Sequence, residues 1–140
     1  MEAGLVVGHG DVPLMWHLPK DRTISFLPEG VISDDPSTHL WYFIEENRDT
    51  VEGFAHTHPG RGVPRQSWED VTTFAAWEQG LGRRLKWWIL SEDSAVLLTW
   101  KGPERHSYEA VVLNRDPPWA ADLRKHSFAS PDPSEVFGHH

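Results

Sequence analysis

The chain has 140 residues, a formal net charge of −8 and no cysteine. Its length fits one globular domain, and a hydrophobic fraction of 39% with eight tryptophans is enough to build a core. The negative charge argues against a nucleic-acid partner, because phosphate binding depends on clustered lysine and arginine. The lack of cysteine excludes disulfides, thiol catalysis and cysteine-bound zinc, which leaves His, Asp and Glu as protein ligands for a metal.

Membrane association is also not expected. The sequence has no run of about 18 apolar residues, the length that a spanning helix needs. It also has no N-terminal stretch with the charge and apolar pattern of a secretory signal. We therefore expect a cytoplasmic protein without a membrane span.

The first part of the chain changes from strand patterns to a helix pattern. Residues 4–8 and 12–18 are apolar runs separated by a His-Gly-Asp turn, which predicts a strand pair. Residues 23–27 alternate enough to predict another strand, closed by a Pro-Glu-Gly segment. An Asp-Pro helix start and apolar residues at helical spacing then predict a helix over about 36–48.

The middle of the chain predicts a strand, a loop and a helix in that order. Residues 50–58 alternate as a strand does, and the Gly/Pro-rich segment 59–64 predicts a loop at the end of that strand. Ser67 is a good N-cap for a helix that runs to Gly80 or Gly82. The helical spacing predicts that this helix buries Trp68, Val71 and Ala75.

Three more strands are predicted at 86–90, 95–100 and 108–113, with a short helix near 119–126. Mixed elements with mostly antiparallel neighbours indicate an α+β fold, a single-domain mixed, largely antiparallel sheet flanked by two or three helices. We place the domain at 1–116. Proline and charge dominate after it, so we expect 117–140 to be a C-terminal extension, partly disordered.

The strand over 50–58 carries the residues that predict chemistry. His56 and His58 share one face of the strand, because side chains two residues apart project together, about 6–7 Å apart along the backbone. Both rings can therefore reach one ion. A hydrolytic zinc site needs a third protein ligand and keeps one position for water. Asp70, in the first turn of the next helix, is the candidate third ligand.

The other histidines have no mutual spacing that indicates a second site. They are His9, His17, His39, His106 and His126. Two histidines on a strand are often an ordinary polar face, and Ser-x-x-Asp is a common helix start. The case for a metal therefore depends on the joint occurrence of the two patterns.

Together, these patterns resemble a known signature. The stretch His56-Thr57-His58-Pro59 is followed, after eight residues from His58, by Ser67-Trp68-Glu69-Asp70. This is similar to the JAMM signature of the JAB/MPN metalloprotease family, in particular its small prokaryotic-type members. The resemblance implies an MPN/cytidine-deaminase-like architecture and a Zn²⁺ ion held by His56, His58 and Asp70, with water at the remaining position.

The resemblance also implies the catalytic groups. Zinc lowers the pKa of bound water to roughly 7, and a Glu on the family's early strand serves as general base. Glu2 matches that position, with one residue before Gly4 where the family usually has two, and Glu29 stays open as the second candidate. Ser67 would stabilise the oxyanion that develops on the substrate carbonyl.

The leading hypothesis is a zinc metallopeptidase or isopeptidase that cleaves at the C-terminal tail of a ubiquitin-like or sulfur-carrier-like protein. The first alternative is a catalytically inactive MPN-like scaffold or protein-interaction module, which keeps the fold but lacks the base. The second alternative is an unrelated His-x-His enzyme that uses redox-active iron, for which we expect a third His to be needed.

Overall fold

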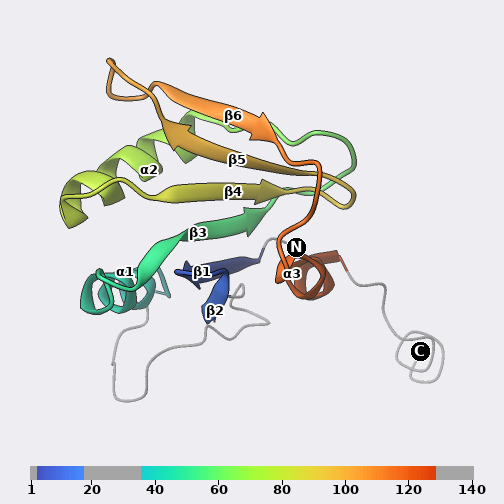
Figure 1. The fold of residues 1–140 in the computed structure, drawn as a ribbon, viewed down its shortest axis with the longest axis horizontal. Coiled ribbons are helices and arrows are strands. Elements are labelled where there is room, and N and C mark those ends of the chain that lie inside the picture. Colours follow the sequence, from blue (N-terminus) through green and yellow to red (C-terminus); the bar gives the residue numbers. More distant parts are fainter. Residues whose placement is uncertain (1–2, 18–35, 129–140) are drawn as a thin grey trace.

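The computed structural model describes residues 3–17 and 36–128, which form six strands and three helices (Figure 1). The strands lie in one sheet of order β2-β1-β3-β4-β5-β6. All neighbouring strands are antiparallel except β3 and β4, which are parallel. In chain order the elements are β1 (Gly4–Gly8), β2 (Val12–His17), α1 (Pro36–Glu46), β3 (Val51–Thr57), α2 (Trp68–Leu81), β4 (Lys86–Leu90), β5 (Ala95–Trp100), β6 (Tyr108–Val112) and α3 (Ala120–Phe128).

This arrangement confirms the predicted α+β class with a mostly antiparallel sheet. The helix predicted over 36–48 ends at Glu46, and the strand predicted at 23–27 lies outside the described residues. No helix within residues 3–17 and 36–128 has the length and apolar character needed to cross a membrane.

The sheet has a hydrophobic core on each face, because successive residues of its central strands point to opposite sides. Val6, Trp87 and Ile89 belong to a core with α1 and α2. Their neighbours along the strands, including Trp88, belong to a second core under α3. The three helices therefore cover two faces, with α1 and α2 on one and α3 on the other (Figure 1).

The segment after residue 117 packs into this fold as far as residue 128. Trp119, Ala120 and Leu123 are almost completely buried against β1, β3 and β4. Ser127 of α3 lies 2.8 Å from the hydroxyl of Thr57 on β3. The helix predicted near 119–126 is therefore confirmed, and residues 129–140 lie outside the described part.

One prediction for α2 is wrong. Val71 and Ala75 are buried as expected, but the side chain of Trp68 is 67% exposed. Trp68 is the first residue of the helix, and its ring contacts His106 edge-on, with 4.6 Å between ring centroids. Helical spacing predicts which face of a helix a residue occupies, but it does not predict whether other elements cover that face at the first turn.

Candidate metal centre

The centre lies where β3 ends, at the carboxyl ends of the parallel strands β3 and β4. His58 donates its backbone amide to Leu90 of β4 over 2.9 Å. On the other side, the amide of Ala3 donates to the Thr57 hydroxyl over 2.8 Å, and the Thr57 amide donates to the Ala3 carbonyl over 3.0 Å. The backbone that carries His56 and His58 is thus fixed from both neighbouring strands.

The loop that follows is held against the turn between β4 and β5. The amide of Gly62 donates to Asp93 Oδ1 over 2.7 Å, and the Ser91 hydroxyl donates to the Gly62 carbonyl over 2.6 Å. The Gly62 hydrogen bond lowers the pKa of the exposed Asp93 carboxyl. Gly62 has φ +91°, a left-handed conformation that glycine adopts without strain. These contacts turn the chain back toward the end of β3, where α2 begins.

The first turn of α2 orients the third candidate ligand, Asp70. The Asp70 amide donates to Ser67 Oγ over 3.0 Å, and the Ser67 amide donates to Asp70 Oδ2 over 2.8 Å. This reciprocal pair is a capping box, which satisfies two backbone donors that a helix start leaves free. One carboxylate oxygen of Asp70 is therefore fixed by the helix start, and the group faces the imidazoles.

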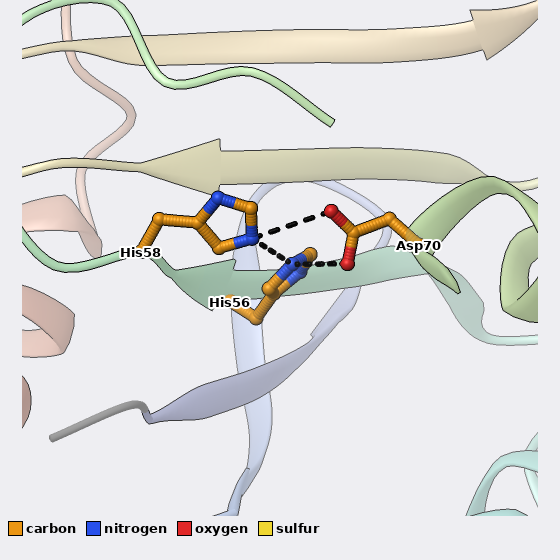
Figure 2. A group of neighbouring side chains, drawn as sticks. All are labelled: His56, His58 and Asp70. Atoms are coloured by element: carbon orange, nitrogen blue, oxygen red, sulfur yellow. Dashed lines mark hydrogen bonds and ion pairs between the residues drawn. The ribbon is translucent and has the colours of Figure 1, made fainter. Parts of the chain in front are cut away.

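Figure 2 shows the two imidazoles and the carboxylate pointing toward one another. The Nε2 atoms of His56 and His58 lie 3.1 Å apart. Each of them lies 3.3 Å from one carboxylate oxygen of Asp70. Ligand bonds of about 2.0–2.2 Å in a tetrahedral zinc site put neighbouring ligand atoms roughly 3.3–3.6 Å apart, close to these spacings. The side chains are 14%, 23% and 17% exposed in the order His56, His58, Asp70, so solvent reaches the group.

The charges at this cluster favour a cation. Burial raises the pKa of Asp70, but hydrogen bonds from both imidazoles and from the Ser67 amide outweigh it and hold that pKa well below its usual range. The carboxylate is therefore ionised at neutral pH. Two imidazole Nε2 atoms facing each other can share only one proton between them, whereas a divalent ion accepts lone pairs from both rings and from Asp70.

The donor set fits zinc and also admits a second metal. Two imidazole nitrogens and a carboxylate are ligands of hydrolytic zinc sites. The same set, with open positions, is also the facial triad of non-haem iron enzymes. A carboxylate in place of the expected third His is thus compatible with iron. Within the described residues, His56, His58 and Asp70 are the His and acidic side chains that lie close enough together to share one metal ion.

The remaining predicted site residues are placed as follows. Ser67 is exposed beside the cluster, with its Oγ accepting from the Asp70 amide. Glu2 and Glu29 lie outside the described residues. Glu52, which shares the strand face of His56, pairs instead with Lys86 over 2.6 Å at the other end of β3.

His17 is a residue that the sequence did not connect with this centre. It lies on β2 opposite Gly4 of β1, and Gly4 in turn lies opposite His56 of β3. His17 and His56 also line one cavity. Alternation along β2 could have predicted the face of His17, but the pairing of β2 and β3 on either side of β1 is a tertiary feature.

No protein-family model matches this chain, and no curated protein matches it significantly. The likeness to the JAMM family therefore rests on the signature residues themselves.

Proposed function

We propose that the protein is a zinc-dependent hydrolase of JAMM type with an MPN-like architecture. It cleaves a peptide or isopeptide bond at the C-terminal tail of a ubiquitin-like or sulfur-carrier-like protein. The observation that carries the proposal is the convergence of His56, His58 and Asp70 from the end of β3 and the start of α2. The kind of bond and the substrate class are supported by the resemblance of the signature around these residues.

The chain's own residues prepare the site for a bound metal. His56, His58 and Asp70 would hold Zn²⁺, which supplies a Lewis acid and a bound water with a pKa of about 7. The Ser67 amide holds Asp70 Oδ2, and such contacts to a ligand fix its orientation. The part exposure of all three side chains leaves the centre accessible to a substrate.

Ser67 is suited to stabilise negative charge on the substrate. Its Oγ accepts the Asp70 amide, so its own O–H can donate to another oxygen. It is the N-cap of α2, where free backbone amides and the helix dipole also favour an anion. A scissile carbonyl oxygen bound here would be stabilised as it becomes an oxyanion.

Glu2 is the preferred general base in this proposal, with Glu29 as the alternative. Its neighbour Ala3 is fixed to Thr57 by two hydrogen bonds, and Gly4 lies opposite His56. The resemblance gives this role to a Glu that shortly precedes the first glycine of the early strand. A carboxylate at that place could take the proton of the attacking water and return it to the leaving amine.

Metal binding and hydrolysis test the proposal together. After removal of metal and reloading, we expect one zinc per chain in the wild type and in His9→Ala, which changes an exposed turn residue, and none in His56→Ala. The reloaded enzyme should release a fluorophore from the C-terminal tail of a ubiquitin-like or sulfur-carrier protein. Less than about half an equivalent of zinc, unchanged in His56→Ala, would contradict the metal centre.

The two alternatives give different results in the same experiment. An inactive scaffold binds zinc but hydrolyses nothing, and Glu2→Gln and Glu29→Gln then change no measured property. The iron enzyme is favoured by the facial His-His-Asp donor set. The iron alternative predicts an activity that requires Fe²⁺ and oxygen. Zinc would inhibit this activity.

A further inference from the structure

A cavity of about 560 Å³ lies at the C-terminal end of α2, between this helix and the segment that joins β5 to β6. Three arginines line it. Arg83 and Arg84 come directly after α2, and Arg105 belongs to the segment between the two strands. Gly82, the C-cap of α2, follows Asp70 by 12 residues, or about 18 Å of helix, so this cavity is separate from the candidate metal centre.

The protein holds two of the guanidinium groups in place. Arg84 Nη1 donates to Glu78 Oε1 over 3.0 Å, and Arg84 Cζ lies 3.8 Å from the centre of the Trp100 ring. Arg83 Nη1 donates to two main-chain carbonyls in the chain between α1 and the start of β3. These contacts fix the direction of both groups, so a ligand would not have to order them on binding.

The segment between β5 and β6 brings Arg105 to the same cavity. The Trp100 indole donates to the Glu104 carbonyl over 2.8 Å, and the Ser107 amide donates to the same carbonyl over 3.1 Å. Gly102 has φ +66°, and a Cβ at this position would overlap the Trp100 ring, so glycine lets the turn lie against the indole. The backbone that carries the exposed Arg105 is therefore positioned by Trp100.

The cavity carries more positive than negative charge. Glu78 is the acidic residue in its lining, and it also accepts hydrogen bonds from Leu85, Trp87 and Tyr108. Within the described part of the chain, neither Arg83 nor Arg105 forms an ion pair, and none of the three arginines donates to the last carbonyls of α2. Like charges repel one another, so three guanidinium groups around one cavity favour the binding of an anion.

We infer that this cavity binds the phosphate group of a small molecule. Arginine presents paired N–H donors that match the oxygens of a phosphate. Two of the three guanidinium charges have no carboxylate partner among the described residues, which suits a group that carries close to two negative charges. The volume lies in the range of small-ligand sites and leaves room for the rest of the molecule. The site is independent of the metal centre and of the proposed hydrolysis.

Titration calorimetry with inorganic phosphate and with AMP tests the site. We expect both probes to bind saturably to the zinc-loaded wild type and equally well to His56→Ala, because the cavity lies away from the metal. Arg105→Gln should weaken both probes at least about tenfold, since it removes charged hydrogen bonds. Arg115→Gln, which removes the same charge from an exposed position after β6 and outside the cavity lining, is the matched control. It should stay within about twofold of the wild type.

A second variant tests the cavity from α2. Gln79 is exposed and belongs to the lining, so Gln79→Glu adds a carboxylate to the cavity. We expect it to weaken both phosphate probes about as much as Arg105→Gln does, whereas Gln79→Ala should bind them like the wild type. Tighter binding of AMP would identify a nucleotide as the ligand class, and equal affinity would identify a smaller phosphate. Both results support the phosphate site.

Other results would overturn the inference. The first is the absence of saturable binding of either probe to the wild type. The second is an equal effect of Arg105→Gln and Arg115→Gln, which would show a general attraction by surface charge. The third is the loss of binding in His56→Ala, which would place the probes at the metal. Malonate, a dianion with two carboxylates, is the final comparison, and an affinity equal to that of phosphate would contradict the assignment of a phosphate.

Discussion

The helix α2 places a carboxylate against the sheet at each end, and the two groups have different surroundings. Glu78, near the C-terminal end, is 3% exposed. It accepts hydrogen bonds from the Leu85 amide over 2.9 Å, the Trp87 indole over 2.7 Å and the Tyr108 hydroxyl, and it pairs with Arg84 over 3.0 Å. Asp70, at the other end, accepts one amide hydrogen bond and otherwise faces two imidazole nitrogens.

This difference separates a structural carboxylate from a ligand carboxylate. Glu78 is saturated by donors that reside on β4, on β6 and in the segment after α2, so its charge is neutralised inside the protein and links those elements. Asp70 faces two imidazole nitrogens, which can donate to the carboxylate or, when unprotonated, offer lone pairs to the same cation as the carboxylate. Changes at Asp70 should therefore act on metal binding, and changes at Glu78 on folding.

The largest effect is expected from Asp70→Asn. The amide oxygen can still accept from Ser67, but the negative charge at the centre is lost. We expect zinc affinity to fall at least about 100-fold and hydrolysis about 1000-fold. The free energy of unfolding of the metal-free protein should change by less than about 1 kcal/mol. A chelator competition and a urea titration measure the two quantities.

The control for that variant is Asp93→Asn, which changes an exposed acid on the β4–β5 turn. It should keep the zinc affinity of the wild type within about threefold. If Asp70→Asn also binds zinc as tightly as the wild type, the contrast between the two ends of α2 is wrong.

Ser67→Gly sharpens the contrast, because Ser67 belongs to both the helix start and the site. Glycine is tolerated as an N-cap at a cost of a few tenths of a kcal/mol, but it has no O–H donor. We expect kcat to fall by roughly 100- to 1000-fold with a small change in KM and in stability. Ser67→Thr keeps the hydroxyl and should retain most activity. A fall in stability that accounts for the lost activity would show that Ser67 acts only as a cap.

Glu78→Gln tests the structural end of the helix. A glutamine there places an amide N–H₂ among donors and removes the charge that pairs with Arg84, so we expect a loss of about 3 kcal/mol in the free energy of unfolding. Zinc affinity per folded chain should stay within about twofold. Gln79→Ala, at the exposed neighbouring position, is the matched control and should change stability by less than about 0.5 kcal/mol. A Glu78→Gln protein that stays stable but no longer binds zinc would contradict the assignment of Glu78 as the structural carboxylate.

The smallest effect is expected from Tyr108→Phe and depends on pH. Burial, together with the Glu78 hydrogen bond and charge, raises the pKa of Tyr108. A raised pKa means that the folded state holds this proton more tightly, so its stabilisation is complete below the unfolded pKa of about 10 and is lost above it. The free energy of unfolding of the wild type should exceed that of Tyr108→Phe by about 1 kcal/mol near neutral pH, and this difference should shrink at alkaline pH. Parallel stability curves for the two proteins would contradict this.

Local sequence predicted much of the fold and of the site. The alternation over β3 placed His56 and His58 on one face, because strand geometry has a fixed period of two. The Ser67 cap and its partner Asp70 also follow from a short-range rule, the reciprocal hydrogen bonding of a capping box. These features depend on residues within a few positions of one another, which is why the sequence indicated them.

Other features depend on contacts between distant segments. Trp68 has the spacing of a buried residue, yet it is 67% exposed and contacts His106, 38 positions further along the chain. His17 becomes part of the candidate site only because β1 pairs with β2 on one side and with β3 on the other. No local pattern encodes which strands become neighbours.

By itself, the sequence determined the helix and strand pattern and a metal-binding signature, since both follow from backbone periods and side-chain chemistry along one stretch of chain. The tertiary structure decided which lone pairs face each other, which carboxylate of α2 is saturated, and that a cavity joins His56 to His17. The reason is that distances between side chains on different elements are set by the packing of the whole sheet and its helices, and not by their separation in the chain.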